Sequence, residues 1–166
     1  MQSYCRGLLP LGLAVAALAF ALPLFGSSAY GQTGPFAHLA GSWSGDGTIA
    51  TSNGGSERIR CRARYTVGGG GWQFQQALTC ASDSYKFEVS CNAEAQGTTV
   101  TGTWQETTRN VSGTLSGRIS GQLIQASVTA PGFSAGVAVN TSGRSQAVTI
   151  TPQGTDVTNV TVRLHK

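Results

Sequence analysis

The sequence predicts an all-β protein, a single antiparallel up-and-down β-barrel of about 8–10 strands. From residue 42 onward, runs of β-favouring residues alternate with turn signals at intervals of mostly about eight to twelve residues, which is typical of a barrel or sandwich. Glycine and threonine are abundant, leucine is scarce after residue 31, and charged residues make up only 11% of the chain. This composition favours strands over helices. Several runs also alternate apolar and polar residues, so each of these strands has one apolar side.

Residues 1–31 have the three parts of a secretory signal peptide in order. A short segment with one cation precedes a long apolar run, and small residues follow that run. Cleavage is expected after Ala29 or Gly31. A permanent membrane anchor is the alternative, since the apolar run is almost long enough to span a bilayer. Pro10 and Pro23 interrupt the run, so the sequence predicts export to the periplasm or the medium, with no membrane segment after cleavage.

The rest of the chain has the length of one domain. Residues 32–40 form a lead-in that could make one helical turn over a barrel end, and residues 41–166 form the barrel. A chain of about 135 residues buries roughly two thirds of its unfolded surface, so one core is expected. Removal of residues 1–31 takes away Arg6 and no acid. It leaves ten Lys and Arg against seven Asp and Glu, a net charge of +3.

Ten strands are expected, give or take two. Each is bounded by glycine, proline, asparagine or other turn-forming residues. They are predicted at residues 42–51, 57–67, 72–81, 85–93, 98–107, 111–119, 122–130, 134–141, 145–151 and 157–165.

The second predicted strand alternates most clearly. Successive side chains of a strand point to opposite sides, so the strand has an apolar side of Ile59, Cys61, Ala63, Tyr65 and Val67 and a cationic side of Arg58, Arg60, Arg62 and Arg64. Four glycines then reverse the chain, and the next strand has its own apolar side with Trp72, Phe74, Leu78 and Cys80. These two strands are predicted to form a hairpin with one side in the core.

Cysteine usage agrees with export, because an oxidising compartment favours pairing of two of the three cysteines that follow the signal peptide. Cys61 and Cys80 both point inward. If Val67 pairs with Trp72 across the turn, Cys61 lies one diagonal step from Cys80, and a small slip in register brings the two opposite each other. We predict a Cys61–Cys80 disulfide. Cys91 is expected to be a buried free thiol, with a Cys80–Cys91 bridge or an intermolecular bridge as the alternatives.

The four arginines of the second strand form the most distinctive predicted surface. The planar donor fork of arginine suits carboxylates, phosphates or an anionic polysaccharide, so Arg58, Arg60, Arg62 and Arg64 are candidates for binding an anion or a partner. The alternative is a solvated outer side that discourages edge aggregation. Nucleic acid is not predicted as a partner, because the net charge is small and no aromatic residue lies between the arginines.

No pattern of catalytic or metal-ligating residues is present. A closed barrel would bring His38 and His165 near each other, where they could bind a metal or haem, but a pair lacks the third ligand of most catalytic zinc sites. No Gly-x-Ser-x-Gly turn lies between a strand and a helix. Glu106 lies on the same side of its strand as Trp104 without a second carboxyl in evidence. We therefore predict no catalytic residue, no metal site and no cofactor, and a protein that is not an enzyme.

Aromatic side chains are predicted to point into the barrel. A barrel of about eight to ten strands is either filled by side chains or holds one small ligand. Small inward residues such as Ala63, Gly113 and Ala135 leave room beside the aromatic ones. We therefore predict that the interior binds a small apolar or amphipathic molecule. The candidate binding residues are Trp43, Tyr65, Trp72, Phe74, Phe87 and Trp104.

The tripeptide Gly41-Ser42-Trp43, at the start of the first strand, resembles the glycine-x-tryptophan motif of the calycins, the superfamily of the lipocalins and their relatives. The resemblance implies a cation from the final strand over this tryptophan, and Arg163 is the matching position. The chain is also similar to small exported bacterial β-barrel proteins. It further resembles the periplasmic inhibitors of secreted metalloproteases, whose N-terminal segment enters the protease cleft. Residues 32–40 would be that segment, which implies an envelope interaction protein such as a hydrolase inhibitor as the alternative function.

Overall fold

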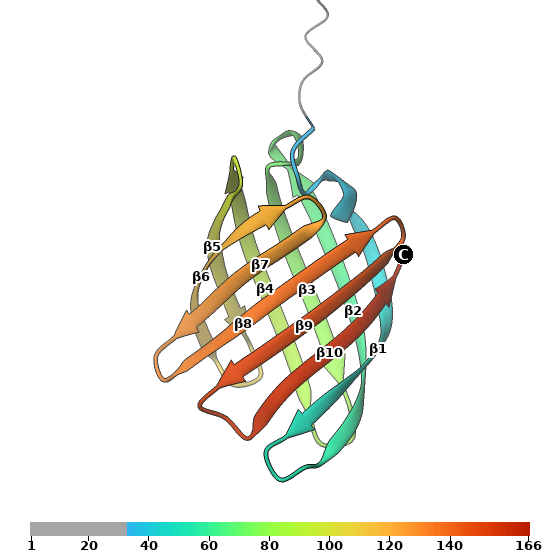
Figure 1. Ribbon diagram of the computed structural model, residues 1–166, viewed down its shortest axis with the longest axis vertical. Helices are drawn as coiled ribbons and strands as arrows, with labels where there is room; N and C mark the ends of the chain where they lie inside the picture. The colour runs from blue at the N-terminus through green and yellow to red at the C-terminus, as the bar shows by residue number, and fades with distance from the viewer. Residues whose placement is uncertain (1–32) are drawn as a thin grey trace, which may run out of the picture. The chain divides into compact units, whose positions relative to one another are not determined.

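The computed structural model describes residues 33–166, so the expected signal peptide at residues 1–31 lies outside the described residues. Ten antiparallel strands form one closed barrel, in which each strand pairs with the next along the chain and the last pairs with the first (Figure 1). The predicted up-and-down barrel is confirmed. In the described part of the chain, no helix has the length and apolar character needed to cross a membrane.

Each expected strand is present, and no predicted boundary differs from the observed one by more than three residues. Two short 3-10 turns accompany the strands, η1 before the first strand and η2 between the second and the third. The elements are η1 (Ala37–Leu39), β1 (Gly41–Thr51), β2 (Ser56–Gly68), η2 (Gly69–Gly71), β3 (Gln73–Ala81), β4 (Lys86–Gln96), β5 (Thr99–Glu106), β6 (Val111–Ser120), β7 (Leu123–Ala130), β8 (Phe133–Ser142), β9 (Ser145–Gln153) and β10 (Val157–His165).

Glycine on the inner side of the strands lets neighbouring segments approach closely. A Cβ atom added at Gly113 would lie 1.8 Å from the carbonyl oxygen of Thr129 and 3.0 Å from Nε1 of Trp104. The Trp104 indole instead lies against β6 and donates a hydrogen bond of 3.2 Å to the carbonyl oxygen of Thr114. The tight curvature expected from inward glycines is therefore present at this position.

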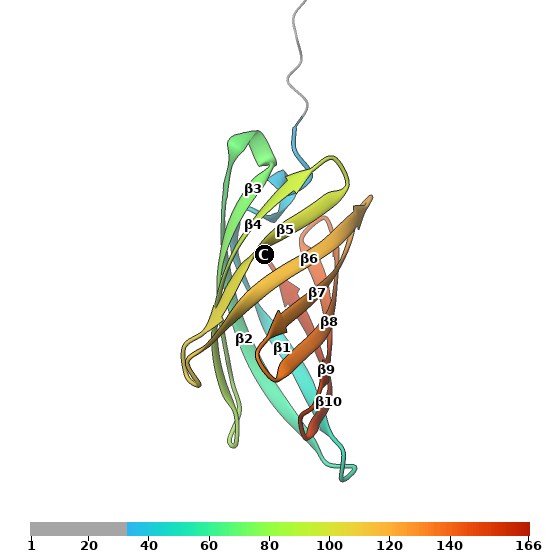
Figure 2. The same cartoon turned by 90° about the vertical axis from the view of Figure 1, so that its left-hand side faces the viewer.

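The lead-in packs against one end of the barrel, beside η2 (Figure 2). The backbone N–H of Gly34 donates to the carbonyl oxygen of Gly70 at 2.8 Å, and that of Phe36 donates to Gly71 at 2.9 Å. Phe36 and Leu39 are 0% and 1% exposed. Because these two apolar side chains enter the core, the described part of the lead-in belongs to the barrel and does not project from it.

Candidate functional sites

The six aromatic candidates of the interior fall into two groups. Trp43 and Tyr65 are buried, at 2% and 6% exposure, and belong to the packed core. The other four are partly exposed and pack against that core: Trp72, Phe74, Phe87 and Trp104. Trp72 differs from its prediction in one respect, because it follows η2 as part of the turn and does not lie within β3.

Trp43 lies beneath the lead-in at the end of the barrel that η1 covers. Its Nε1 donates a hydrogen bond of 2.8 Å to the carbonyl oxygen of Leu39. The Nζ atom of Lys166 lies 5.0 Å from the centre of its ring and also donates to the carbonyl oxygen of His38 at 3.2 Å. This geometry allows a cation–π contact. Trp43 of the glycine-x-tryptophan motif thus contacts both the lead-in, through Leu39, and the last residue, Lys166.

The expectation that Arg163 supplies this cation is wrong. Val162 and Leu164 are buried inside the barrel, so Arg163 between them points outward. In the β1–β10 register it lies opposite Asp46 on the outer side. The cation over Trp43 comes instead from Lys166, which lies just beyond the end of β10, where strand alternation no longer predicts direction.

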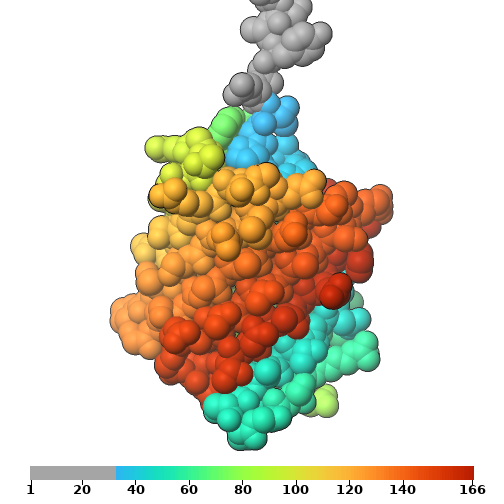
Figure 3. All heavy atoms as spheres, viewed as in Figure 1, coloured from blue at the N-terminus to red at the C-terminus, as the bar shows by residue number. Residues whose placement is uncertain are grey.

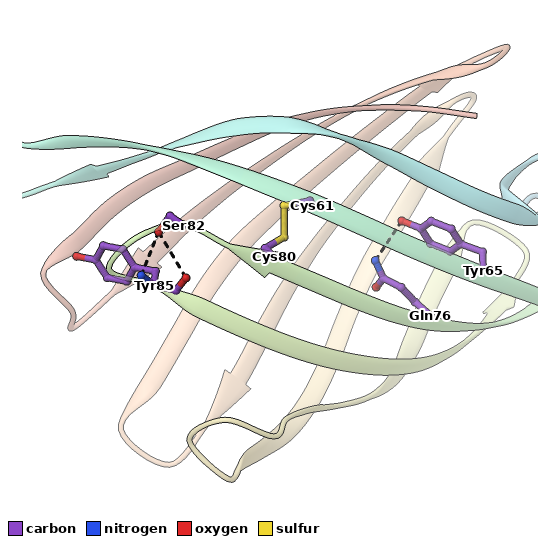
Figure 4. The surroundings of a disulfide bond; sticks show 6 residues. All are labelled: Cys61, Tyr65, Gln76, Cys80, Ser82 and Tyr85. Carbon is purple, nitrogen blue, oxygen red and sulfur yellow. Dashed lines mark hydrogen bonds between the residues drawn. A yellow bond between two sulfur atoms is a disulfide. The ribbon is translucent and has the colours of Figure 1, made fainter.

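Tyr65 belongs to a chain of buried polar groups in the interior. Its hydroxyl donates to Oε1 of Gln146 at 3.0 Å. It also accepts from Nε2 of Gln76 at 3.1 Å, the bond drawn in Figure 4. Nε2 of Gln146 in turn donates to the hydroxyl of Thr141 at 3.0 Å. Burial raises the pKa of Tyr65 far above its usual range, so the phenol stays neutral. Gln76 is itself only half-buried.

At the other end of the barrel, Glu106 points inward and is 6% exposed. Its carboxylate accepts hydrogen bonds from the backbone N–H groups of Glu88, Thr108 and Arg109, at 3.1, 3.1 and 2.8 Å, and from the Thr108 hydroxyl. Burial by itself would raise the pKa of Glu106, but these donors outweigh it and the pKa is lowered. Glu106 therefore remains a carboxylate that closes the β5–β6 turn, a structural role.

Replacing Glu106 with glutamine is expected to lower the free energy of unfolding at pH 7 by about 1–3 kcal/mol, because an amide cannot accept all of these hydrogen bonds. The carboxylate has a lowered pKa in the folded state, so its contribution is present above the ordinary value of 4.5 and is lost as the pH falls through the lowered folded value. Urea unfolding at pH 7 and pH 3 should show the difference between variant and wild type shrinking in acid. Glu94→Gln, at an exposed position, is the control and should have little effect.

Inward residues of β7, β8 and β9 are less deeply buried than those of β1 and β2. The buried side chains concentrate on β1, β2, β4 and the lead-in. On β7, β8 and β9, by contrast, many inward apolar side chains are only half-buried. They are Ile124, Ala126, Val128, Val137, Val139, Val148 and Ile150.

The two histidines do not form a site. His38 lies in η1, and His165 points outward from β10, where its Nδ1 is 3.2 Å from the Ser145 hydroxyl. Among residues 33–166, no group of three or more His, Cys, Asp or Glu side chains could hold a metal ion.

The disulfide joins Cys61 and Cys80, as predicted, and within the described residues Cys91 is a buried free thiol whose pKa burial raises to about 11. The two bridged residues are directly opposite in the β2–β3 register, with Cα atoms 4.1 Å apart. The trial pairing of Val67 with Trp72 is wrong, because Val67 pairs with Phe74. The turn therefore contains two more residues than that pairing allowed, and this difference places the cysteines opposite each other.

The arginine side of β2 points outward, as its alternation predicted. Arg58 and Arg60 each lie 3.8 Å from a carboxylate oxygen of Asp46 on β1, and their side chains are 81% and 90% exposed. Arg62 and Arg64 are exposed as well. Ion pairs this long and this exposed contribute little stability.

Two hollows lie on the outside of the barrel. The larger, of about 490 Å³, lies over β2–β5, and polar side chains such as Thr66, Gln75 and Asn92 line it. The smaller, of about 270 Å³, lies over β7–β9, among the strands turned toward the viewer in Figure 3, and Gln125, Ala138 and Thr149 are part of its lining.

These features define a closed, ten-stranded, antiparallel β-barrel with one disulfide and one end covered by the lead-in. The chain is similar in fold to the crystal structure of Rv2717c from M. tuberculosis, with a TM-score of 0.59 at 11% sequence identity. The match covers 78% of this chain and 93% of that one. No family model and no curated protein matches the sequence. The similarity therefore concerns the fold alone.

Proposed function

We propose that this protein is an exported, non-enzymatic, lipocalin-like barrel that binds a small apolar or amphipathic molecule in its interior. The observation that carries the proposal is the set of inward apolar side chains on β7–β9 that are only half-buried. This intermediate exposure indicates that the β7–β9 wall is less deeply buried than the β1–β2 wall. Aromatic groups lie among the same partly buried residues, with Phe133 packing 5.7 Å from Trp104 between ring centres.

The chemistry of the interior supports a ligand that is mainly apolar with one hydrogen-bonding group. Valine and isoleucine line the β7–β9 wall, and such lining is typical of small-molecule sites. Gln76, a half-buried polar residue of β3, is linked to β9 through Tyr65 and Gln146, and its amide has further hydrogen-bonding capacity. Export to the periplasm or the medium is part of the proposal, and the Cys61–Cys80 disulfide supports it, since disulfides persist mainly in oxidising compartments.

A pair of neighbouring substitutions on β8 tests the interior site. Val137 points inward and Ala138 outward, so Val137→Trp fills the interior while Ala138→Trp adds the same side chain outside. With cis-parinaric acid as a fluorescent apolar probe, the wild type and Ala138→Trp should bind one molecule saturably, and Val137→Trp should bind at least about tenfold more weakly. Equal binding by both variants, or no saturable binding by the wild type, would refute the interior site. Native mass spectrometry of the protein from its own host would then identify a retained ligand.

The alternative function is an envelope interaction protein such as a periplasmic hydrolase inhibitor. An inhibitor of the kind that inserts its N-terminal segment needs that segment to be free. Phe36 and Leu39 are buried in the barrel, so this mode receives no support from the described lead-in. An interaction through the arginines of β2 does not depend on the lead-in.

A further inference from the structure

A fifth arginine, Arg163, lies near the four arginines of β2, although it is about 100 residues away in the sequence. β1 pairs with β2 on one side and with β10 on the other, and Asp46 lies opposite both Arg60 and Arg163. Arg163 therefore lies two strands from Arg60, a distance of about 10 Å. We call the outer surface formed by Arg58, Arg60, Arg62, Arg64 and Arg163 the arginine stripe.

Positive charge is concentrated on the arginine stripe. Its five arginines and the single carboxylate between them, Asp46, give a net charge of +4. The rest of residues 33–166 has five Lys and Arg and six Asp and Glu, a net charge of −1. The stripe thus accounts for the whole net positive charge of residues 33–166, so the positive electrostatic potential is concentrated on this surface.

The guanidinium groups of the stripe are available to a ligand. Within the described chain, Arg62, Arg64 and Arg163 take part in no salt bridge, and Arg58 and Arg60 make only the long contacts to Asp46. The outward side chains paired directly with the stripe, apart from Asp46, are small. They are Ser42, Ser44 and Thr48 on β1, Ala77, Thr79 and Ala81 on β3, and Ala147 on β9. Larger outward side chains lie at its borders, His165 beside Arg163 and Lys86 and Glu88 on β4.

Protection against edge aggregation does not explain the stripe. Charged residues serve that purpose on strands that have an unpaired edge. β2 is paired along both sides, with β1 and with β3, and the barrel is closed. Edge protection therefore does not account for four outward arginines on β2.

The larger outer hollow continues the line of the stripe. Thr66 follows Arg64 on the outer side of β2 and lines the hollow of about 490 Å³. Gln75 pairs with Thr66, and Asn92 pairs with Gln75, so hydroxyl and amide groups lie next to the last arginine of the line. Such groups hydrogen-bond to sugar hydroxyls, while arginine pairs with carboxylates. Glu94 also lines the hollow, so the carboxylates of a ligand would pair with the arginines and only its hydroxyl groups would enter the hollow.

We propose that the arginine stripe and this polar hollow bind a linear anionic polysaccharide with repeated carboxylates. Successive outward arginines are about 7 Å apart and the line on β2 is roughly 20 Å long, so one chain contacts several arginines at once and gains affinity from the repetition. A membrane surface is disfavoured because no aromatic or large aliphatic side chain lies beside the stripe. Single-stranded nucleic acid is disfavoured because no outward Phe, Tyr or Trp side chain on which bases stack lies beside the stripe.

Polygalacturonate, a linear carboxylated polysaccharide, is the probe that tests the proposal, with neutral dextran as the comparison. Calorimetric titration of the purified protein should show binding of polygalacturonate that weakens with added salt, and no binding of dextran. Arg62→Ser and Arg163→Ser should each weaken binding by about two- to fivefold, the range expected for one exposed ion pair. Gln75→Ala should also weaken it.

Arg118→Ser is the matched control. Arg118 points outward near the end of β6, opposite Thr99 and Gln125, and its removal costs the same charge as the removal of Arg62. Binding by Arg118→Ser should equal that of the wild type. If Arg62→Ser, Arg163→Ser and Arg118→Ser all lost the same affinity, binding would depend on net charge alone, and the proposal would be overturned. An Arg163→Ser variant with wild-type affinity, the absence of polygalacturonate binding, or tighter binding to phosphatidylglycerol vesicles or single-stranded DNA would also overturn it.

Discussion

Replacing Trp43 with alanine is expected to lower the free energy of unfolding by about 3–5 kcal/mol, the usual cost of truncating a large buried aromatic residue. Trp43 is 2% exposed and fills the end of the barrel beneath η1. The substitution leaves a cavity, removes the donor to the carbonyl oxygen of Leu39, and removes the ring against which Lys166 lies. The lead-in should loosen together with the barrel end, because its turn is held by that hydrogen bond.

Urea unfolding followed by far-ultraviolet circular dichroism measures this loss. Trp72→Ala is the control, since Trp72 is only partly buried and follows η2, and its loss should be clearly smaller. Trp43→Phe keeps most of the apolar area without the N–H donor, so it should recover part of the stability. A Trp43→Ala midpoint equal to that of the wild type or of Trp72→Ala would show that the barrel does not depend on this residue.

The fold could be predicted from the sequence because its elements are local. In β2 the alternation of Ile59, Cys61 and Ala63 with arginines defines both the strand and its two sides, and no tertiary information is needed. The observed burial of β2 follows this alternation residue by residue. Short turns between such strands then leave sequential antiparallel pairing as the simplest arrangement.

The errors occur where side-chain alternation carries no information. Four consecutive glycines, Gly68–Gly71, show that the chain turns but do not show how many residues the turn takes, so the trial register of β2 and β3 was two residues off. Lys166 lies past the end of β10, and its position over Trp43 depends on where the chain ends meet.

The candidate sites depend on contacts between distant strands. The Tyr65–Gln146 hydrogen bond joins residues 81 positions apart, and only barrel closure brings β9 near β2. The same closure adds Arg163 to the arginines of β2 through Asp46. The sequence does contain a partial signal for the polar chain, because Gln76 lies on the same side of its strand as Phe74 and Leu78. A polar residue on an apolar side indicates a partner but does not name it.

Removal of the disulfide is expected to lower the free energy of unfolding by about 3 kcal/mol, the chain-entropy value for a loop of this length. Cys61 and Cys80 are 19 residues apart in sequence, and the bridge fixes the β2–β3 register that the glycine turn leaves open. Both cysteines are buried, so the double variant Cys61→Ala/Cys80→Ala avoids placing an unpaired hydroxyl in the core. Its urea midpoint should fall well below that of the wild type.

A thiol reductant separates the bridge from the packing of the side chains. Dithiothreitol should lower the midpoint of the wild type and of Cys91→Ala, which keep the bridge, and leave the midpoint of the double variant unchanged. The Cys91→Ala variant should otherwise lose only the smaller cost of a truncated side chain. If dithiothreitol left the wild-type midpoint unchanged under conditions that reduce the bridge, the disulfide would not be needed to fix the register. The register would then be determined by Tyr65 and its partners on β3 and β9, because their hydrogen bonds form only when β2 pairs with β3 in this alignment.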